Sequence, residues 1–387
     1  MKTIRYVPLL GIFIICTAAF SSDTVPLLEL YKTGKIRFEK EFVLDDHAMP
    51  GDLFFESPST VACGPEGNIF VVDSGANNIK KFDARGKFLK TIGREGQGPG
   101  EFGRIFYCAF AGDRLIVWDS GNLRLCAFTS EGEYIDSLNI PYGSGYVRKL
   151  RGFPSGEILV EMEKNFRNEP DKPQTCTIDL YSADLKRVKT IYKRELWRKK
   201  YIRTKEYGTT TLYFPYSADV QWDVTPDNRI VIGFSADYEL DIYDRTGTKV
   251  GTVSHDCEPV EVTEKDKKDY FDSLTFYRMG ERLPEIPDYI TKYTEFPEHR
   301  PVYKDVLVDE GGNIWVLLNR EEEDENGKTF DVFDPSGRFI SRVLMEGDAA
   351  FPDNRNRYIL HGRSLLTIET GADDLYRVIR YKMEKPG

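Results

Sequence analysis

Short apolar segments, each led by a turn, recur along the chain. The first is "GNIFVVDSG" at residues 67–75, where a glycine turn precedes five residues suited to a buried strand. Five further segments have the same form: RLIVWDSG at 114–121, EILVEM at 157–162, RIVIGF at 229–234, NIWVLL at 313–318 and RSLLTIE at 363–369. Six copies of one pattern predict an architectural repeat.

Each copy belongs to a longer unit of alternating apolar runs and turns. After the recurring segment comes a pair of apolar runs joined by an aromatic-Asp-x-x-Gly turn, as in "IKKFDARGKFLKTIG" at 79–93. Before the recurring segment comes another apolar run, as in "STVACGPEG" at 59–67. The tightest spacings between units match the roughly 40 to 50 residues of one propeller blade. We therefore expect an all-β fold, a six-bladed β-propeller with four-stranded antiparallel blades. The equivalent aromatic residues are Phe82, Phe128, Tyr181, Tyr243, Phe333 and Tyr381.

The two ends of the chain complement each other. The last unit, "YRVIRYKMEKPG" from residue 376, stops before a fourth strand, whereas "KIRFEKEFVL" at Lys35–Leu44 has no partner of its own. Pairing these segments would leave no open sheet edge. The pattern thus predicts that the N-terminal strand closes the ring beside the strand at Leu375–Met383.

Two long segments interrupt the repeat, near 194–215 and 257–300. The second lies in a gap wide enough for a seventh blade, but its pattern indicates a helix. Thr263 and Asp266 have the spacing of a capping box, and the aromatic and apolar residues after them share one helical face that ends at Gly280. We expect one helical insertion here. The residues of that face are Tyr270, Leu274 and Tyr277.

The first two units resemble NHL repeats, especially those of secreted bacterial six-bladed propeller proteins. Residues 67–102 follow the NHL pattern throughout, and "VWDSGNLRLCAF" at 117–128 keeps the family's arginine as Arg124, where the first unit has Asn78. The later units retain only the hydrophobic skeleton. The resemblance implies the fold, but propellers of this type host unrelated activities.

The N-terminus has the pattern of a secretory signal peptide. Lys2 and Arg5 precede the apolar run Val7–Ile15, and the triplet at 19–21 suits signal peptidase. The run is shorter than the roughly 20 residues of a membrane span. We expect a signal peptide at 1–21, a single propeller domain at 22–387, and a periplasmic or extracellular location. Lipidation at Cys16 is disfavoured because Ile15 stands where a small residue is needed.

Charge and cysteine content narrow the classes of partner. Removing Lys2 and Arg5 changes the formal net charge from −10 to −12, which argues against nucleic-acid binding. Five of the 6 cysteines remain in the mature chain, and no CxxC spacing occurs. Their disulfide status stays open. We expect a monomer without a transmembrane segment in the mature chain.

Two repeated Asp-Ser pairs could be mistaken for catalytic groups. Asp73-Ser74 and Asp119-Ser120 end equivalent apolar runs, where Asp and Ser commonly bond to backbone amides of a turn. The same position holds other residue types in later units, including Phe234. We therefore expect these pairs to have an architectural role.

The basic and aromatic segment Lys193–Tyr207 is the strongest candidate for ligand binding. It interleaves cations with aromatic residues in an acidic protein, as a site for an anionic glycan or a protein would. Both insertions join one blade to the next, so we expect them to rise on one face and to wall the channel mouth. A non-catalytic extracytoplasmic binding or scaffold function, without a cofactor, follows. The predicted contact residues are Trp197, Arg198, Lys199, Tyr201, Tyr277 and Tyr289.

The alternative is a propeller enzyme of the lyase or lactonase type. Such relatives hold a metal in the central channel with histidines or carboxylates. His255 and His299 are the candidate ligands because one ends the fourth unit and the other precedes the fifth. Two histidines without close spacing form a weak motif, so the binding function is preferred.

The signal-peptide pattern makes a direct prediction about the exported chain. We expect cleavage near Ser21, because the small residues there fit the peptidase. Intact mass spectrometry of exported material should give a mature chain beginning close to residue 22. A lipid-modified N-terminus at Cys16, or an uncleaved chain, would contradict the prediction.

Overall fold

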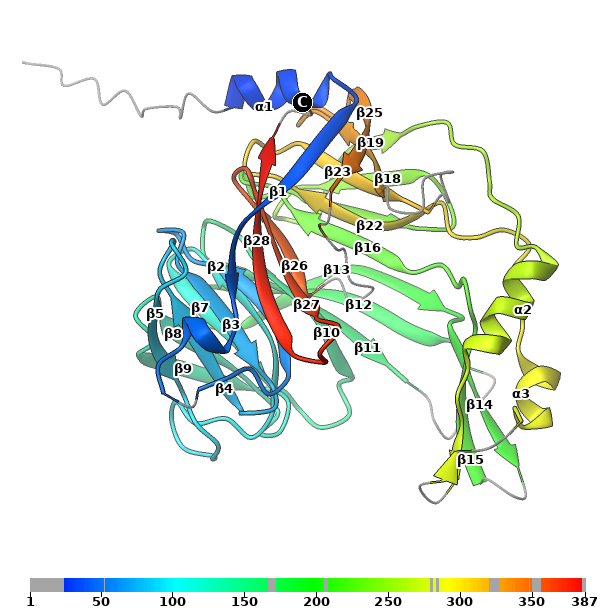
Figure 1. Cartoon of the computed structure of the whole chain (residues 1–387), viewed down its shortest axis with the longest axis horizontal. Coiled ribbons are helices and arrows are strands. Elements are labelled where there is room, and N and C mark those ends of the chain that lie inside the picture. The colour runs from blue at the N-terminus through cyan, green and yellow to red at the C-terminus, as the bar shows by residue number, and fades with distance from the viewer. Residues whose placement is uncertain are drawn as a thin grey trace, which may run out of the picture.

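The computed structural model is built mainly from antiparallel sheets, four of which are four-stranded (Figure 1). It describes residues 24–51, 53–165, 172–204, 208–278, 281–282, 285–319, 328–347, 349 and 356–384. The expected all-β class is confirmed, since the described helices are few and short. The signal-peptide segment 1–21 lies outside the described residues.

Four sheets follow one another as simple meanders. In each sheet the strands are hydrogen-bonded in sequence order, as the repeat predicted. The first contains β2 (Pro58–Cys63), β3 (Ile69–Asp73), β4 (Asn78–Phe82) and β5 (Phe88–Ile92); the second β6 (Ile105–Ala111), β7 (Arg114–Asp119), β8 (Arg124–Thr129) and β9 (Tyr134–Asn139); the third β10 (Tyr146–Gly152), β11 (Ile158–Lys164), β12 (Gln174–Tyr181) and β13 (Arg187–Leu196); the fourth β16 (Val220–Val224), β17 (Ile230–Phe234), β18 (Glu239–Tyr243) and β19 (Lys249–Ser254).

The last two units share the N-terminal strand β1 (Lys35–Leu44). It pairs antiparallel with β28, with Phe38 opposite Met383, and its first residues also pair in parallel with β25. The result is one sheet of order β22-β23-β24-β25-β1-β28-β27-β26. Its other strands are β22 (Tyr303–Val308), β23 (Ile314–Leu318), β24 (Lys328–Phe333), β25 (Phe339–Glu346), β26 (Tyr358–His361), β27 (Ser364–Thr370) and β28 (Tyr376–Glu384).

The aromatic-Asp-x-x-Gly motif forms the tight turn between the last two strands of a sheet. Asp83 Oδ1 accepts hydrogen bonds from the amides of Arg85 and Lys87, and Asp244 and Asp334 accept in the same way in their own turns. Gly86 has φ of 84°, a conformation that glycine adopts without strain. The motif is therefore explained by backbone geometry.

Hydrophobic cores lie between successive sheets. One cluster joins the first and second sheets through Phe70 and Phe128, and another joins the third and fourth through Ile178 and Trp222. The strands of the last unit also pack on the first sheet, for example Ile368 with Val71 in a shared cluster. Each sheet is thus covered on both faces, and the arrangement is propeller-like.

The two insertions pack against each other at one side of the molecule (Figure 1). The first forms the hairpin β14 (Lys199–Thr204) and β15 (Gly208–Tyr213), and the second contains α2 (Glu264–Ser273), β20 (Tyr277–Arg278), β21 (Glu281–Arg282) and α3 (Asp288–Tyr293). Ile202, Leu212 and Ile290 form their shared core. We refer to this body as the insertion lobe.

The predicted helix of the second insertion begins as expected and ends early. Thr263 and Asp266 form the capping box. The helix stops at Ser273 instead of continuing toward Gly280, because Leu274 is extended and packs into the core of the insertion lobe. The prediction of a single long helix was therefore wrong in its C-terminal bound.

A helix before β1 was not predicted. Helix α1 (Thr24–Tyr31) buries Leu27, Leu30 and Tyr31 against the eight-stranded sheet. The Tyr31 hydroxyl donates to Asp309 Oδ2 at 2.7 Å, and its ring meets Trp315 edge-on at 4.9 Å. The apolar spacing of these three residues fits one helical face, but the segment is only two turns long.

The packing of β1 predicts that substitutions on its two faces differ greatly in their effect on the free energy of unfolding. Phe38 is buried in the core that joins the last two units, whereas its neighbour Glu39 is exposed. Phe38→Ala should lower the free energy of unfolding by about 3–5 kcal/mol, and Glu39→Ala by less than about 0.5 kcal/mol. Urea unfolding of both variants measures this. Equal stability of the two would show that β1 does not pack as described.

Candidate functional site

The repeated aspartates anchor the start of the first and second sheets. Asp73 accepts hydrogen bonds from the amides of Glu56 and Ser57 at 2.9 and 2.8 Å, and from Lys80 Nζ at 2.6 Å. Asp119 binds the amides before β6 in the same way. The expected architectural role is confirmed, although these amide partners lie 15–17 residues earlier in the chain and not in the turn that follows the aspartate.

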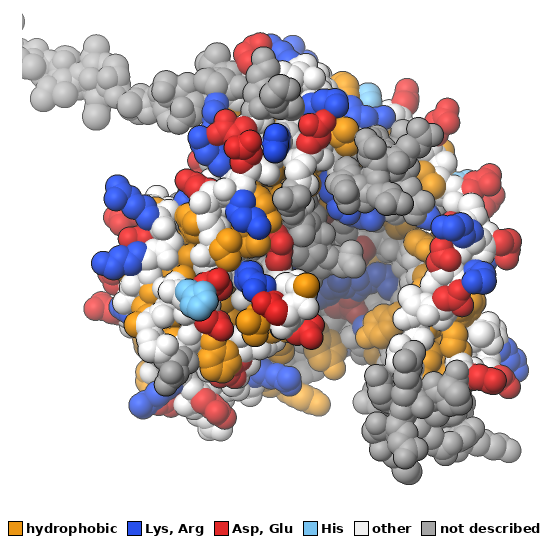
Figure 2. Space-filling view, in the orientation of Figure 1, with side chains coloured by type: hydrophobic (Ala, Val, Ile, Leu, Met, Phe, Trp, Pro, Cys, Tyr) orange, Lys and Arg blue, Asp and Glu red, His pale blue; other side chains and the backbone are white. Residues whose placement is uncertain are grey.

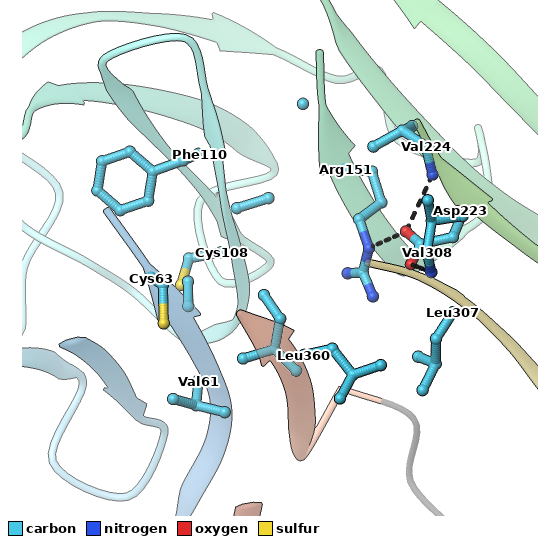
Figure 3. A pocket seen from close by; sticks show the side chains of 14 residues that line it. Val61, Cys63, Cys108, Phe110, Arg151, Asp223, Val224, Leu307, Val308 and Leu360 are labelled. Carbon is cyan, nitrogen blue, oxygen red and sulfur yellow. Dashed lines mark hydrogen bonds and ion pairs between the residues drawn. The ribbon is translucent and has the colours of Figure 1, made fainter. Parts of the chain in front are cut away.

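A cavity of about 180 Å³ lies where the first strands of all six units meet (Figure 3). Its lining is mostly apolar, with one ion pair. The lining residues fall at or near the carboxyl ends of these strands, whereas the insertions lead into the amino ends of β16 and β22, so the cavity lies away from the insertion lobe. The lining residues are Val61, Ala62, Cys63, Cys108, Ala109, Phe110, Arg151, Gly152, Asp223, Val224, Leu307, Val308, Ile359 and Leu360.

The ion pair in the cavity wall is held by backbone groups of three sheets. Arg151 Nε lies 2.7 Å from Asp223 Oδ1, and Arg151 Nη1 donates to the Leu150 carbonyl at 3.0 Å. Asp223 also accepts from the amides of Val224 and Val308 at 3.0 and 3.1 Å. The carboxylate is therefore well supplied with donors.

Two thiols lie on the opposite side of the cavity from the ion pair (Figure 3). Burial raises the pKa of Cys63 to about 12 and that of Cys108 to about 12. Both are therefore neutral near pH 7, as weakly polar groups. They contribute no charge to the cavity and no ready nucleophile.

An ion-pair network connects the third sheet to the base of the hairpin β14–β15. Glu163 on β11 bonds to Arg148, Arg198 and Lys199, with 2.6 Å to Arg148 Nη1 and 2.8 Å to Lys199 Nζ. Asp219, just before β16, binds Arg148 at 3.2 Å and Arg198 at 2.6 Å. Lys and Arg side chains also gather in the central hollow of Figure 2.

Buried polar groups extend the network on both sides. Glu161, fully buried, accepts from Trp222 Nε1 at 2.8 Å and lies 3.8 Å from Arg148. The Gln174 side chain binds the backbone of the hairpin base, donating to the Lys199 carbonyl at 2.9 Å. Three cations thus face three carboxylates, and we call these six side chains the charge network: Arg148, Arg198, Lys199, Glu161, Glu163 and Asp219.

Three exposed aromatic residues adjoin the charge network, two by strand register and one by sequence. Tyr146 is 68% exposed and pairs in register with Glu163, while Tyr213 is 62% exposed and pairs with Lys199. Lys199 Nζ lies 5.6 Å from the Tyr213 ring centroid. Trp197, 57% exposed, precedes Arg198 at the hairpin base. We call Tyr146, Trp197 and Tyr213 the aromatic platform.

The charge of Lys199 is opposed by its surroundings. Burial lowers the pKa of Lys199, and the positive charge of Arg148 adds to the decrease. The adjacent Glu163 carboxylate at 2.8 Å is therefore important for holding an ammonium group here.

The predicted contact residues separate into three groups. Trp197 is exposed, Arg198 and Lys199 lie in the charge network, and Tyr201 and Tyr289 are half-buried. Tyr289 packs against the core of the insertion lobe. The side chain of Tyr277 lies outside the described residues.

Sequence reasoning missed Tyr146, Tyr213, Glu163 and the Arg151–Asp223 pair. Tyr146 begins β10 and Tyr213 ends β15. The chain has 22 tyrosines, and no motif distinguishes these two from the others. Glu163 could have been suspected from "EMEK", in which two acidic residues interrupt an apolar strand.

The two histidines proposed as metal ligands have separate surroundings. His255 stacks on Phe339 with ring centroids 4.2 Å apart. The backbone of His299 pairs with that of Glu261 in an isolated antiparallel β-bridge. Within the described part of the chain, no three His, Cys, Asp or Glu residues come together in a way that could hold a metal ion.

Comparison with known proteins supports the propeller class. The family model described as 6-bladed beta-propeller (DUF5128) matches residues 52–142, which contain β2–β9. No curated protein matches the sequence. No helix in the described ranges is long and apolar enough to cross a membrane.

Several solved structures are similar at low sequence identity. A member of the DUF4221 family from Bacteroides vulgatus is 12% identical, with a TM-score of 0.48 over 91% of this chain and 98% of that one. A Bacteroides fragilis protein named for its inferred export is 11% identical, with a TM-score of 0.48 and coverage of 91% and 95%. Virginiamycin B lyase from Staphylococcus aureus is 9% identical, with a TM-score of 0.40 and coverage of 84% and 94%.

Proposed function

We propose that the protein is an exported, non-catalytic propeller that binds a glycan on its aromatic platform. The observation that carries the proposal is the exposure of Tyr146, Trp197 and Tyr213 around a fixed set of charged groups. Tyrosine and tryptophan supply large, rigid contact area at low entropic cost. Export rests on the signal-peptide pattern at 1–21.

The scaffold proposed for this site is a closed ring of six blades, completed by β1. Two observations support closure. The cavity is lined by the first strand of each of the six units, and hydrophobic clusters join the last unit to both the first and the fifth. A closed ring leaves no sheet edge open and gives the connections between blades a rigid base.

Rigidity of the platform follows from its attachment. The insertion lobe has its own core, and the Tyr270 hydroxyl donates to the Tyr213 carbonyl at 3.3 Å. The charge network and Gln174 tie the hairpin base to the third sheet. Preorganised aromatic groups bind with a smaller entropic cost than mobile ones.

The charge balance favours an uncharged glycan over an anionic one. Arg198 and Lys199 would attract an anion if they were unpaired, but Glu163 and Asp219 already pair with them. Hydroxyl groups of a neutral sugar can hydrogen-bond to such a network without displacing its ion pairs. Its apolar ring faces can lie on the exposed aromatic side chains.

The test is affinity for a panel of neutral, uronate-containing and sulfated oligosaccharides. Wild-type protein should bind at least one neutral member. Trp197→Ala and Tyr213→Ala should each weaken that binding roughly fivefold or more, as expected for losing about 1 kcal/mol of aromatic contact. Isothermal titration calorimetry measures the change.

Phe54→Ala is the matched control, because Phe54 is also about half exposed but belongs to the connection before the first sheet. This variant should bind like wild type. Binding restricted to sulfated or uronate glycans would contradict the neutral ligand class. Unchanged affinity in both platform variants would contradict the site.

A further inference from the structure

The cavity at the carboxyl ends of the first strands contains hydrogen-bond donors that have no partner among the residues that the structure describes. A guanidinium group has five N–H donors. Arg151 uses one for Asp223 and one for the Leu150 carbonyl, and the other three have no hydrogen-bond partner among the described residues. Figure 3 shows this guanidinium group beside Asp223, directed into the space between the lining residues.

The charge in the cavity wall is already balanced. Asp223 neutralises Arg151, and its own oxygens accept two further backbone amides. A second carboxylate entering the cavity would leave one negative charge without a full counter-charge in a partly buried site, which is unfavourable. A neutral acceptor oxygen can take the remaining N–H donors without this penalty.

The rest of the wall suits an apolar body. Phe110, Leu307 and Leu360 line the cavity together with the thiols of Cys63 and Cys108, which are uncharged near pH 7. The cavity volume is about 180 Å³, slightly more than the roughly 150 Å³ of an apolar cavity that holds benzene. A ring or short chain with one small polar substituent therefore fits.

We propose that this cavity is a binding site for a small, neutral carbonyl compound, whose oxygen accepts hydrogen bonds from Arg151 and whose apolar part faces Phe110, Leu360 and the two thiols. Such a site differs from the aromatic platform in position and in ligand chemistry. Its occupancy is independent of glycan binding.

Three probes of similar shape separate the contribution of the carbonyl acceptor from those of the apolar ring and of a negative charge. Acetophenone carries the carbonyl, ethylbenzene lacks the acceptor, and benzoate replaces the methyl ketone with a carboxylate. Calorimetric titration at pH 7 should show saturable binding of acetophenone. Ethylbenzene and benzoate should each bind at least about tenfold more weakly, equivalent to ~1.4 kcal/mol.

Two variants test the location from opposite walls. Arg151→Met removes the donors and should reduce acetophenone affinity to that of ethylbenzene. Cys63→Leu keeps the ion pair and fills the cavity from the other side, so it should reduce binding of both neutral probes. Arg187→Met is the matched control, since Arg187 pairs with Asp179 on the third sheet, far from the cavity lining.

Several outcomes would overturn the proposal. Equal affinity for ethylbenzene and acetophenone would show that Arg151 does not contribute to recognition. Tighter binding of benzoate would show that the site selects anions. The site itself would be refuted by an absence of saturable acetophenone binding, or by wild-type affinity in correctly folded Arg151→Met or Cys63→Leu protein.

Discussion

Burial of carboxylates between strands is the constraint on which this structure depends. A buried carboxylate is costly unless several donors surround it. Asp73 and Asp119 meet this requirement by binding the amides that lead into the first strand of their own sheet, together with Lys80 and Arg124. The start of each of these sheets is thereby fixed to the end of its second strand.

The third sheet uses the equivalent position differently. Glu161 turns to Trp222 of the next sheet and to Arg148, and Glu163 two residues later binds the hairpin base. In the first two sheets, the buried carboxylate obtains hydrogen-bond donors from the loop before the first strand. In the third sheet, donors to Glu163 come from the base of the insertion hairpin. The acidic residues at and next to this repeated position of the third sheet thus support the proposed binding surface.

The sequence predicted the regular part of the fold because strand pattern and turn chemistry are local. The six apolar segments, β1 and the Thr263 capping box could be located to within a few residues. Helix α1 was missed because it is short and depends on contacts such as Tyr31 with Asp309, 278 residues away. The charge network and the cavity join residues from different sheets, so their composition follows from the three-dimensional arrangement and could not be deduced from spacing.

The charge network holds the insertion hairpin to the third sheet, and amide hydrogen exchange measures this attachment most directly. In Glu163→Gln protein, which loses one charge with little change in shape, strands β14 and β15 should exchange at least about tenfold faster than in wild type, while β2–β9 stay unchanged. Glu239→Gln, the same change at an exposed carboxylate, serves as control. Wild-type exchange in β14 and β15 of Glu163→Gln protein would contradict the account.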